Sequence, residues 1–279
     1  MRSLLAFALL ALAAPAAELP ITIQFRAVVG NRDLACGQSY PNIGTTQTTI
    51  APRDFRFYIH NITLISESGQ PIPVTLKQDE KWQLDDLALL DFENATAGCA
   101  NGTPELNTRV VGTIPASAKP RGLRFTLGVP MDKNHTDLTR MPSPLNLTAL
   151  AWSWNAGRKF ARLDFSSTGA PRGSAIHLGS TGCMPNDTRM TIPTTCAAPN
   201  RAEMDFPSFD PAKDTVIADL GALLKDSNAD ASGCMSGPRT LACGPLFANF
   251  GLPFPGQQLQ PQSFFRVLKP AAPVESAGR

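Results

Sequence analysis

The sequence predicts an all-β domain held together by disulfides, and three observations lead to this expectation. The chain of 279 residues contains 25 prolines and 21 glycines, which break helices and form turns. Its clearest hydrophobic pattern is the two-residue alternation of strands, and long helical periods are scarce. It also contains six cysteines, an even number that is typical of disulfide pairs in an exported protein.

The N-terminus has the three parts of a secretory signal peptide. Met1-Arg2 supplies the positive region, residues 4–13 form an apolar run, and Ala14-Pro15-Ala16 provides small residues for cleavage. The apolar run is shorter than the roughly 20 residues of a membrane-spanning helix, and no cysteine follows it that would carry a lipid. We therefore expect residues 1–17 to be removed, and the mature protein to be periplasmic, secreted or on the cell surface without a membrane anchor.

The first strands of the domain are predicted from alternation. Residues 21–29 (ITIQFRAVV) open the domain as a strand, and residues 54–65 (DFRFYIHNITLI) give the strongest strand signal in the chain. In the second segment Phe55, Phe57 and Ile59 share one face, while Arg56, Tyr58 and His60 share the other. The alternation changes phase after Asn61, which indicates either a bulge or a strand buried on both sides.

The later elements follow in order along the chain. Residues 72–77 fit a return strand, 82–92 fit either a short helix or a loop with a strand, and 122–129 fit a strand. Residues 149–165 read as a hairpin around Asn155-Ala156-Gly157, and 174–178 as a strand. A helix is expected over 214–226, capped by Asp214, with one apolar face. The domain should cover residues 18–268, with a flexible tail over 269–279.

The cysteines fit disulfides better than a thiolate metal site, because no CxxC pair is present. Six cysteines can pair in many ways, and sequence alone does not choose among them. Proximity in the chain suggests two pairs and leaves the third: Cys183–Cys196, Cys234–Cys243 and Cys36–Cys99.

Charge and motifs argue against two broad classes of function. The 25 basic and 23 acidic residues nearly balance, giving a net charge of +2, and no basic cluster suited to nucleic acid occurs. The chain lacks a GxSxG nucleophile motif, an HExxH zinc motif and a glycine-rich phosphate loop. We therefore expect a protein that is neither a nucleic-acid binder nor an enzyme.

Scarce residues are the candidates for chemistry. The chain has three histidines, His60, His135 and His177. Trp152 and Trp154 flank one serine, so on a strand both indoles would point to the same face. Each of these residues also has an ordinary explanation, namely a core aromatic, a hydrogen-bonded histidine or a surface histidine.

Several segments taken together resemble the MbnP-like proteins, also called metallo-mystery-pair four-Cys proteins. The segments are DFRFYIHNITLI, WQL with LLDFENATAGC, GVPMDKNH, PLNLTALAWSWNAGRKFARLDF and HLGSTGC, in this order. The resemblance extends from Ile21 to Arg266, nearly the whole mature chain. It implies a bacterial, exported, antiparallel β-sandwich with long loops, one or two short helices and a disulfide-stapled structure.

The resemblance also implies a function in copper acquisition or homeostasis. In the family, a partner dihaem enzyme of the MauG and cytochrome c peroxidase type oxidises a tryptophan to kynurenine, and copper binds beside it. The matching motifs make His135 and His177 the expected copper ligands and Trp152 or Trp154 the oxidised residue. Two neutral imidazoles suit Cu(I) or Cu(II).

The chain departs from the family pattern at three places. Ala151 precedes the first tryptophan, Gly157-Arg158-Lys159-Phe160 replaces Gly-Tyr-Lys-Phe, and His60 stands where a small residue is usual. His60 is therefore either a third ligand or a packing residue, and Cys234–Cys243 is an addition to the four family cysteines. Two other functions remain open: a metal-free structural or adhesive envelope protein, and, less well supported, a copper-dependent redox enzyme.

Overall fold

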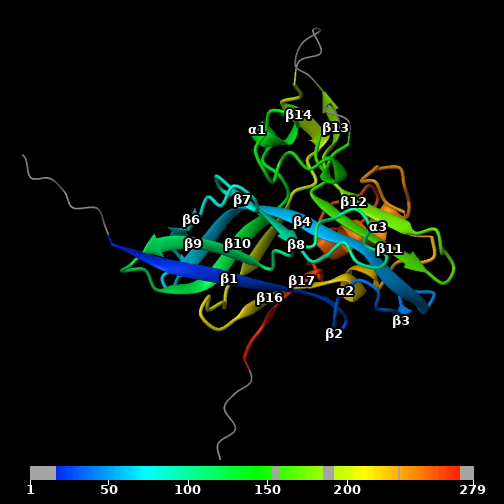
Figure 1. The fold of residues 1–279 in the computed structure, drawn as a ribbon, viewed down its shortest axis with the longest axis horizontal. Coiled ribbons are helices and arrows are strands. Elements are labelled where there is room, and N and C mark those ends of the chain that lie inside the picture. The colour runs from blue at the N-terminus through cyan, green and yellow to red at the C-terminus, as the bar shows by residue number, and fades with distance from the viewer. Residues whose placement is uncertain (1–16, 153–156, 185–191, 232, 271–279) are drawn as a thin grey trace, which may run out of the picture.

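Two β-sheets pack face to face in the computed structural model, which describes residues 17–152, 157–184, 192–231 and 233–270 (Figure 1). The first sheet has the order β17 (Phe265–Leu268), β16 (Thr215–Asp219), β1 (Glu18–Val29), β9 (Arg109–Pro115) and β6 (Thr75–Leu76), with β2 (Arg32–Asp33) beside β1. All its pairs are antiparallel except β1 with β16.

The second sheet has nine strands built around the long strand β4 (Thr48–Ser66). Its main path is β12 (Ser174–Leu178), β11 (Ala161–Ser167), β4, β10 (Pro120–Leu127) and β15 (Ala202–Phe206). The four shorter strands are β3 (Tyr40–Ile43), β5 (Pro71–Pro73), β7 (Gln83–Leu84) and β8 (Leu87–Asp91).

The remaining elements are short. A separate two-stranded hairpin consists of β13 (Thr181–Met184) and β14 (Thr195–Ala198). The helices are α1 (Met131–Asn134), α2 (Leu220–Leu224) and α3 (Cys243–Phe250), with a 3-10 turn over Thr148–Leu150. Among the described residues, no helix is both long and apolar enough to cross a lipid bilayer. The expected all-β sandwich is confirmed.

The core between the sheets is rich in phenylalanine. Phe25 of β1 contacts Phe57 of β4 and Phe125 of β10, with ring centroids 6.4 and 5.8 Å apart. Phe265 of β17 lies 5.4 Å from Phe57. Burying one such ring contributes about 2–3 kcal/mol, so these contacts hold the two sheets together.

Strand β4 confirms the predicted change of phase. Asn61 has a φ of +52°, and Asn61 and Ile62 together oppose Phe125, because His60 pairs with Thr126 and Thr63 with Arg124. This is a β-bulge. The strand is also buried on both sides: Arg56 and Tyr58 are 2% and 1% exposed although they face away from the phenylalanine core. We call their side of the sheet the outer face.

The helix predicted over 214–226 was wrong in its first half. Thr215–Asp219 forms strand β16 between β1 and β17, and only Leu220–Leu224 is helical. An apolar run such as Val216-Ile217-Ala218 fits a strand buried on both faces as well as it fits a helix. The cap is Asp219, which accepts a hydrogen bond from Ala222 N, and not Asp214.

Other expectations have mixed outcomes. Residues 82–92 form strands β7 and β8, which settles the choice that the sequence left open, and 174–178 is strand β12 as predicted. Helix α3 and strand β17 were not predicted. In the expected hairpin, Ala151 bridges to Arg158, while 153–156 lie outside the described residues. The predicted signal-peptide residues 1–16 and tail residues 271–279 also lie outside them.

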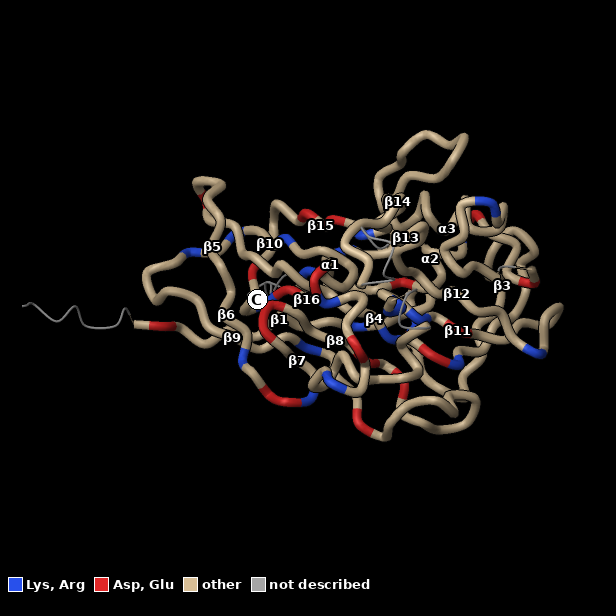
Figure 2. The backbone as a smooth tube through the Cα atoms, turned by 90° about the horizontal axis from the view of Figure 1, so that it is seen from above, with Lys and Arg blue, Asp and Glu red and all other residues tan. Residues whose placement is uncertain are grey.

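The three disulfides are Cys36–Cys99, Cys183–Cys196 and Cys234–Cys243, and no cysteine is free among the described residues. This is the pairing suggested by proximity in the chain. Three disulfides are typical of a protein that folds in an oxidising compartment. Basic and acidic residues are interspersed along the backbone (Figure 2).

Candidate metal centre

A branch in the nine-stranded sheet positions the candidate site. Strands β11 and β10 lie end to end along the same side of β4, since Phe57 and Ile59 both pair with β8 on the other side. Tyr58 connects the two: its N–H donates to Phe160 O (2.8 Å), and its carbonyl accepts from Gly128 N (2.9 Å). Residues 129–159, called the site segment below, therefore leave the sheet at Tyr58.

The site segment covers the outer face of β4 next to this branch. The Tyr58 hydroxyl donates a hydrogen bond to Pro144 O at 2.7 Å, which ties the segment to the sheet. His60 lies two residues further along β4, on the same face as Tyr58. The face of β4 that carries His60 is thus the one over which the segment folds back.

His135 directly follows helix α1 and is 1% exposed. Pro130 begins the helix, and its carbonyl accepts hydrogen bonds from Lys133 N and Asn134 N. The Nε2 atom of His135 lies 3.0 Å from the side-chain nitrogen of Asn134. Nothing in the local sequence indicates that this histidine is buried, because its neighbours (DKNHTD) are polar.

Arg158 fixes the conformation around His135. Its buried guanidinium makes four hydrogen bonds to three backbone carbonyls, those of Lys133, Asn134 and Leu145, at 2.6–3.0 Å. Its backbone N–H donates to Asn134 Oδ1 at 2.9 Å. Burial lowers the pKa of this guanidinium, and among the described residues no carboxylate pairs with it. Arg158 thus joins the end of α1 to the tryptophan-bearing turn.

Gly157, which follows the tryptophan-bearing segment, packs directly on His135. Trp152 N donates to Gly157 O at 3.0 Å, which joins the two ends of that segment. Gly157 has a φ of +82°, and a Cβ atom there would lie 2.9 Å from His135 Cε1. Only glycine permits this approach. Trp154 is outside the described residues.

Trp152 is half-buried and its ring lies over Gly179. A Cβ atom on Gly179 would lie 2.5 Å from Trp152 Cζ3. Gly179 follows His177 by two residues, so the indole is close to the end of β12 that carries His177. The expected proximity of Trp152 to the His177 strand is found, although Trp152 itself is not in a strand.

His60 offers a neutral, buried nitrogen to the same region. Burial is the main cause that lowers the pKa of His60 to about 4; the charges of Asp86 and Asp132 oppose this shift, and those of Arg201 and Lys133 add to it. Two of these residues belong to α1, the helix that ends beside His135. The Nε2 atom of His60 is buried and makes no hydrogen bond among the described residues. A neutral imidazole with an unused nitrogen is suited to bind a metal ion.

A disulfide lies against His135. Cys196 Sγ is 3.6 Å from His135 Nε2, and the ligand atoms of His135, Cys183 and Cys196 all lie within 4.8 Å of one another. Because the two sulfurs are bonded to each other, they are not thiolate ligands in this state. The hairpin β13–β14 that carries them stands beside α1 at the top of Figure 1.

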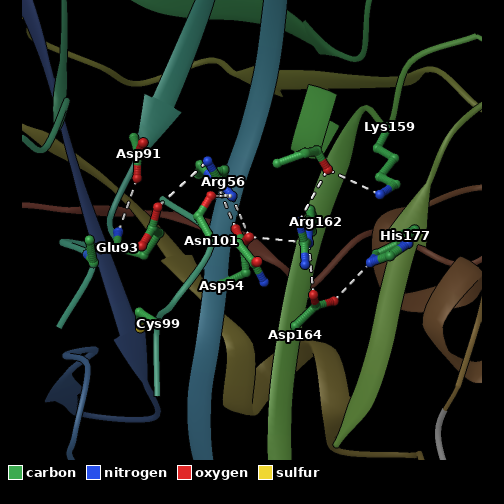
Figure 3. Close-up of polar contacts among 12 residues, drawn as sticks. Asp54, Arg56, Asp91, Glu93, Cys99, Asn101, Lys159, Arg162, Asp164 and His177 are labelled. Atoms are coloured by element: carbon green, nitrogen blue, oxygen red, sulfur yellow. Dashed lines mark hydrogen bonds and ion pairs between the residues drawn. The ribbon is translucent and has the colours of Figure 1, made fainter. Parts of the chain in front are cut away.

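His177 belongs to a different environment, a buried row of charged groups on the outer face (Figure 3). Its Nε2 lies 2.9 Å from Asp164 Oδ1, and Arg162 bonds both Asp164 (2.8 Å) and Asp54 (3.1 Å). Arg56 continues the row by pairing with Asp54 and, at 3.5 Å, with Glu93. Burial favours a raised pKa for Asp164, but the hydrogen bond and charge of His177, together with Arg162, lower it.

The strand register separates His177 from His60. His177 pairs with Arg162, Arg162 pairs with Arg56, and His60 lies four residues further along β4. With about 3.4 Å per residue and 4.8 Å per strand, the two histidines are roughly 17 Å apart. One ion cannot bind both, since metal–nitrogen bonds are about 2 Å long.

The structure thus places His135 against Gly157 near the branch, His60 on the face of β4 that the site segment covers, and His177 in the charged row. Sequence reasoning missed Arg158 and Tyr58, which position this region. An arginine inside an apolar hairpin sequence was a usable signal, because such a residue needs buried acceptors.

Comparisons with known proteins identify the family of the chain. The model of the MbnP family matches residues 18–236. Among solved structures, MbnP from Methylosinus trichosporium is similar, with a TM-score of 0.78 and 28% sequence identity, covering 91% of this chain and 100% of that one. A search of curated proteins finds no match. On the strength of the family match over most of its length, the chain belongs to the MbnP family.

Proposed function

We propose that this protein is an exported bacterial copper-binding protein that takes part in copper acquisition or homeostasis. A dihaem partner of the MauG and cytochrome c peroxidase type would oxidise Trp152 or Trp154 to kynurenine and so complete the site. Membership of the MbnP family supports this proposal, and so does the arrangement of donor groups at the branch.

The observation that carries the proposal is the packing of His135 against Gly157. It brings an imidazole to the base of the tryptophan turn, where oxidation of an indole would create new donors. Indole offers a metal no lone pair, whereas kynurenine has an aniline nitrogen and a ketone. We therefore expect the protein to bind copper strongly only after the tryptophan has been oxidised.

The other donors fit copper as well. His60 is neutral at pH 7 because burial lowers its pKa to about 4, and its Nε2 is buried without a hydrogen bond among the described residues. Imidazole nitrogens suit both Cu(I) and Cu(II). We propose His135 and His60 as the protein's imidazole ligands and assign His177 to the charged row, where Asp164 holds it.

Copper stoichiometry after dialysis against a mild competitor tests the proposal. The wild type and single variants are expressed with and without the dihaem partner. We expect the co-expressed wild type and His177→Ala to retain copper, and His135→Ala and His60→Ala to lose it. Protein made without the partner should behave like the ligand variants. In the co-expressed protein, one tryptophan-containing peptide should show the gain of one oxygen and the loss of one carbon.

Two results would contradict this assignment. Equal copper retention in all proteins, with or without the partner, would reject the site and favour a metal-free envelope function. Copper loss in His177→Ala together with retention in His60→Ala would instead make His177 the second ligand.

A further inference from the structure

The Cys183–Cys196 disulfide differs from the other two in its surroundings. The two cysteines face each other across β13 and β14, a hairpin that belongs to neither large sheet. Both are half-buried. In each of the other disulfides at least one cysteine is almost fully buried, with exposures of 0% for Cys99, 2% for Cys234 and 0% for Cys243. Cys36 is half-buried as well, but only in Cys183–Cys196 are both cysteines half-buried. Because thiol–disulfide exchange requires access to a sulfur, we expect a reductant to react with Cys183–Cys196 first.

The position of this disulfide relative to His135 matches a metal site. For a tetrahedral ion with bonds of about 2.0 Å to nitrogen and 2.3 Å to sulfur, the two ligand atoms are roughly 3.6 Å apart. The observed distance from His135 Nε2 to Cys196 Sγ is 3.6 Å. Cys183 Sγ is within 4.8 Å of both other ligand atoms, so separation of the sulfurs after reduction would complete a three-ligand set.

A fourth soft donor is adjacent. The thioether Sδ of Met131, at the start of α1, lies 3.9 Å from Cys196 Sγ. Thiolate and thioether ligands favour Cu(I), and two thiolates with one imidazole also suit Zn(II). The donor set thus predicts a soft ion rather than Ca²⁺ or Mg²⁺.

We propose that Cys183–Cys196 is a redox-controlled ligand pair, and that its reduced form binds Cu(I) or Zn(II) together with His135. A dithiol supplies two electrons and two protons: the Cys183–Cys196 bond breaks, the dithiol becomes a cyclic disulfide, and two thiols form. Metal binding then releases the two thiol protons. This deepens the proposed function, because His135 serves both sites and reduction would change which donors hold the ion.

Cobalt(II) is a suitable probe, since cobalt–thiolate bonds give a charge-transfer absorption that histidine and kynurenine do not. The mature, folded protein made without the dihaem partner is treated with limiting dithiol, and the freed thiols are located by alkylation and peptide mass. We expect Cys183 and Cys196 to be labelled before the other four cysteines. The reduced protein should then bind one cobalt ion with the thiolate absorption, and the oxidised protein should not show it.

Variants separate the ligands. Cys183→Ser/Cys196→Ser should abolish the absorption, and reduced wild type alkylated at these two cysteines gives the same readout without a mutation. His135→Ala should weaken cobalt binding at least tenfold, while His177→Ala is the matched control and should bind as wild type. Labelling of another disulfide first, an absent band in the reduced wild type, or unchanged affinity in His135→Ala would each overturn the proposal.

The test also keeps the two proposals apart. If the oxidised, co-expressed protein retains copper while the reduced, unmodified protein shows no cobalt–thiolate band, the redox site fails and the copper function stands. If the band appears but the co-expressed protein retains no copper, the redox site stands and the kynurenine site fails.

Discussion

Replacing Arg158 by methionine tests whether one buried side chain holds the site together. Arg158→Met keeps most of the side-chain volume but removes every guanidinium donor. The carbonyls of Asn134 and Leu145 lose their donors, while the Lys133 carbonyl keeps the hydrogen bond from Thr136 Oγ1 at 2.8 Å. At 1% exposure the arginine position is closed to water, so these carbonyls stay desolvated.

The magnitude follows from those contacts. A buried carbonyl left without a donor costs about 1–3 kcal/mol, so two of them set a gross cost of about 2–6 kcal/mol. Removing a buried charge that lacks a carboxylate partner returns part of its desolvation cost. We expect a net loss of about 2 kcal/mol in the free energy of unfolding. Because Asn134 and Gly157 would shift, copper affinity of the co-expressed protein should also fall by about 10–100-fold.

Denaturant unfolding with the disulfides intact measures the first effect, and copper competition measures the second. Arg121→Met is the matched control: Arg121 pairs with Glu67 at the surface, with side chains 65% and 78% exposed, and its loss should change stability by less than about 0.5 kcal/mol. If Arg158→Met were as stable as Arg121→Met, the role given to these hydrogen bonds would be wrong.

Three further outcomes are expected. Gly157→Ala places a Cβ 2.8 Å from the Asn134 side chain at a φ of +82°. It should therefore lower the free energy of unfolding by about 1–3 kcal/mol and weaken copper binding. A copper titration equal to that of the wild type would contradict the contact with His135. His177→Ala removes a partner of Asp164 and should lower the free energy of unfolding by about 1–3 kcal/mol, which thermal unfolding checks; no loss of stability would show that the charged row does not depend on it. The pKa of His60 in the folded protein is lowered to about 4. As pH falls from about 6.5 toward 4, the unfolded chain therefore takes up a proton that the folded chain does not. The free energy of unfolding then falls by about 3 kcal/mol at most. His60→Gln should remove that part of the pH dependence between pH 7 and pH 4.5; identical denaturant midpoints of the two proteins at both pH values would refute the assignment.

Much of the fold was predictable because local pattern and global structure agree. The alternation in residues 54–65 gave both the strand β4 and its bulge at Asn61. Where they disagree, the sequence misled: Val216-Ile217-Ala218 is a strand because β1 and β17 flank it, and no local signal reports such neighbours. Helix α3 was missed for the related reason that its glycine and proline suggest a loop.

The sequence named candidate site residues but did not show which of them lie near one another. Scarcity drew attention to three histidines and two tryptophans, yet only strand register shows that His177 is far from His60. Likewise, the sequence does not distinguish His135 from a surface histidine, and only the structure shows that Arg158 and Gly157 enclose it. These relations depend on contacts between residues distant in sequence, which periodicity does not reveal.

The parallel pairing of β1 with β16 has a consequence for how the chain folds. Strand β1 occupies the middle of its sheet, between β9 and β16, and β17 closes the edge beyond β16. The first strand of the domain therefore pairs with β16 only when residues 215–219 are available, and the edge beyond β16 is complete only with residues 265–268. Such pairing between distant segments is slow, because the entropy cost of closing the loop comes before the contacts that stabilise the pair. We expect a nascent or C-terminally truncated chain to remain incompletely folded and sensitive to proteases, and folding to finish as one late, cooperative event.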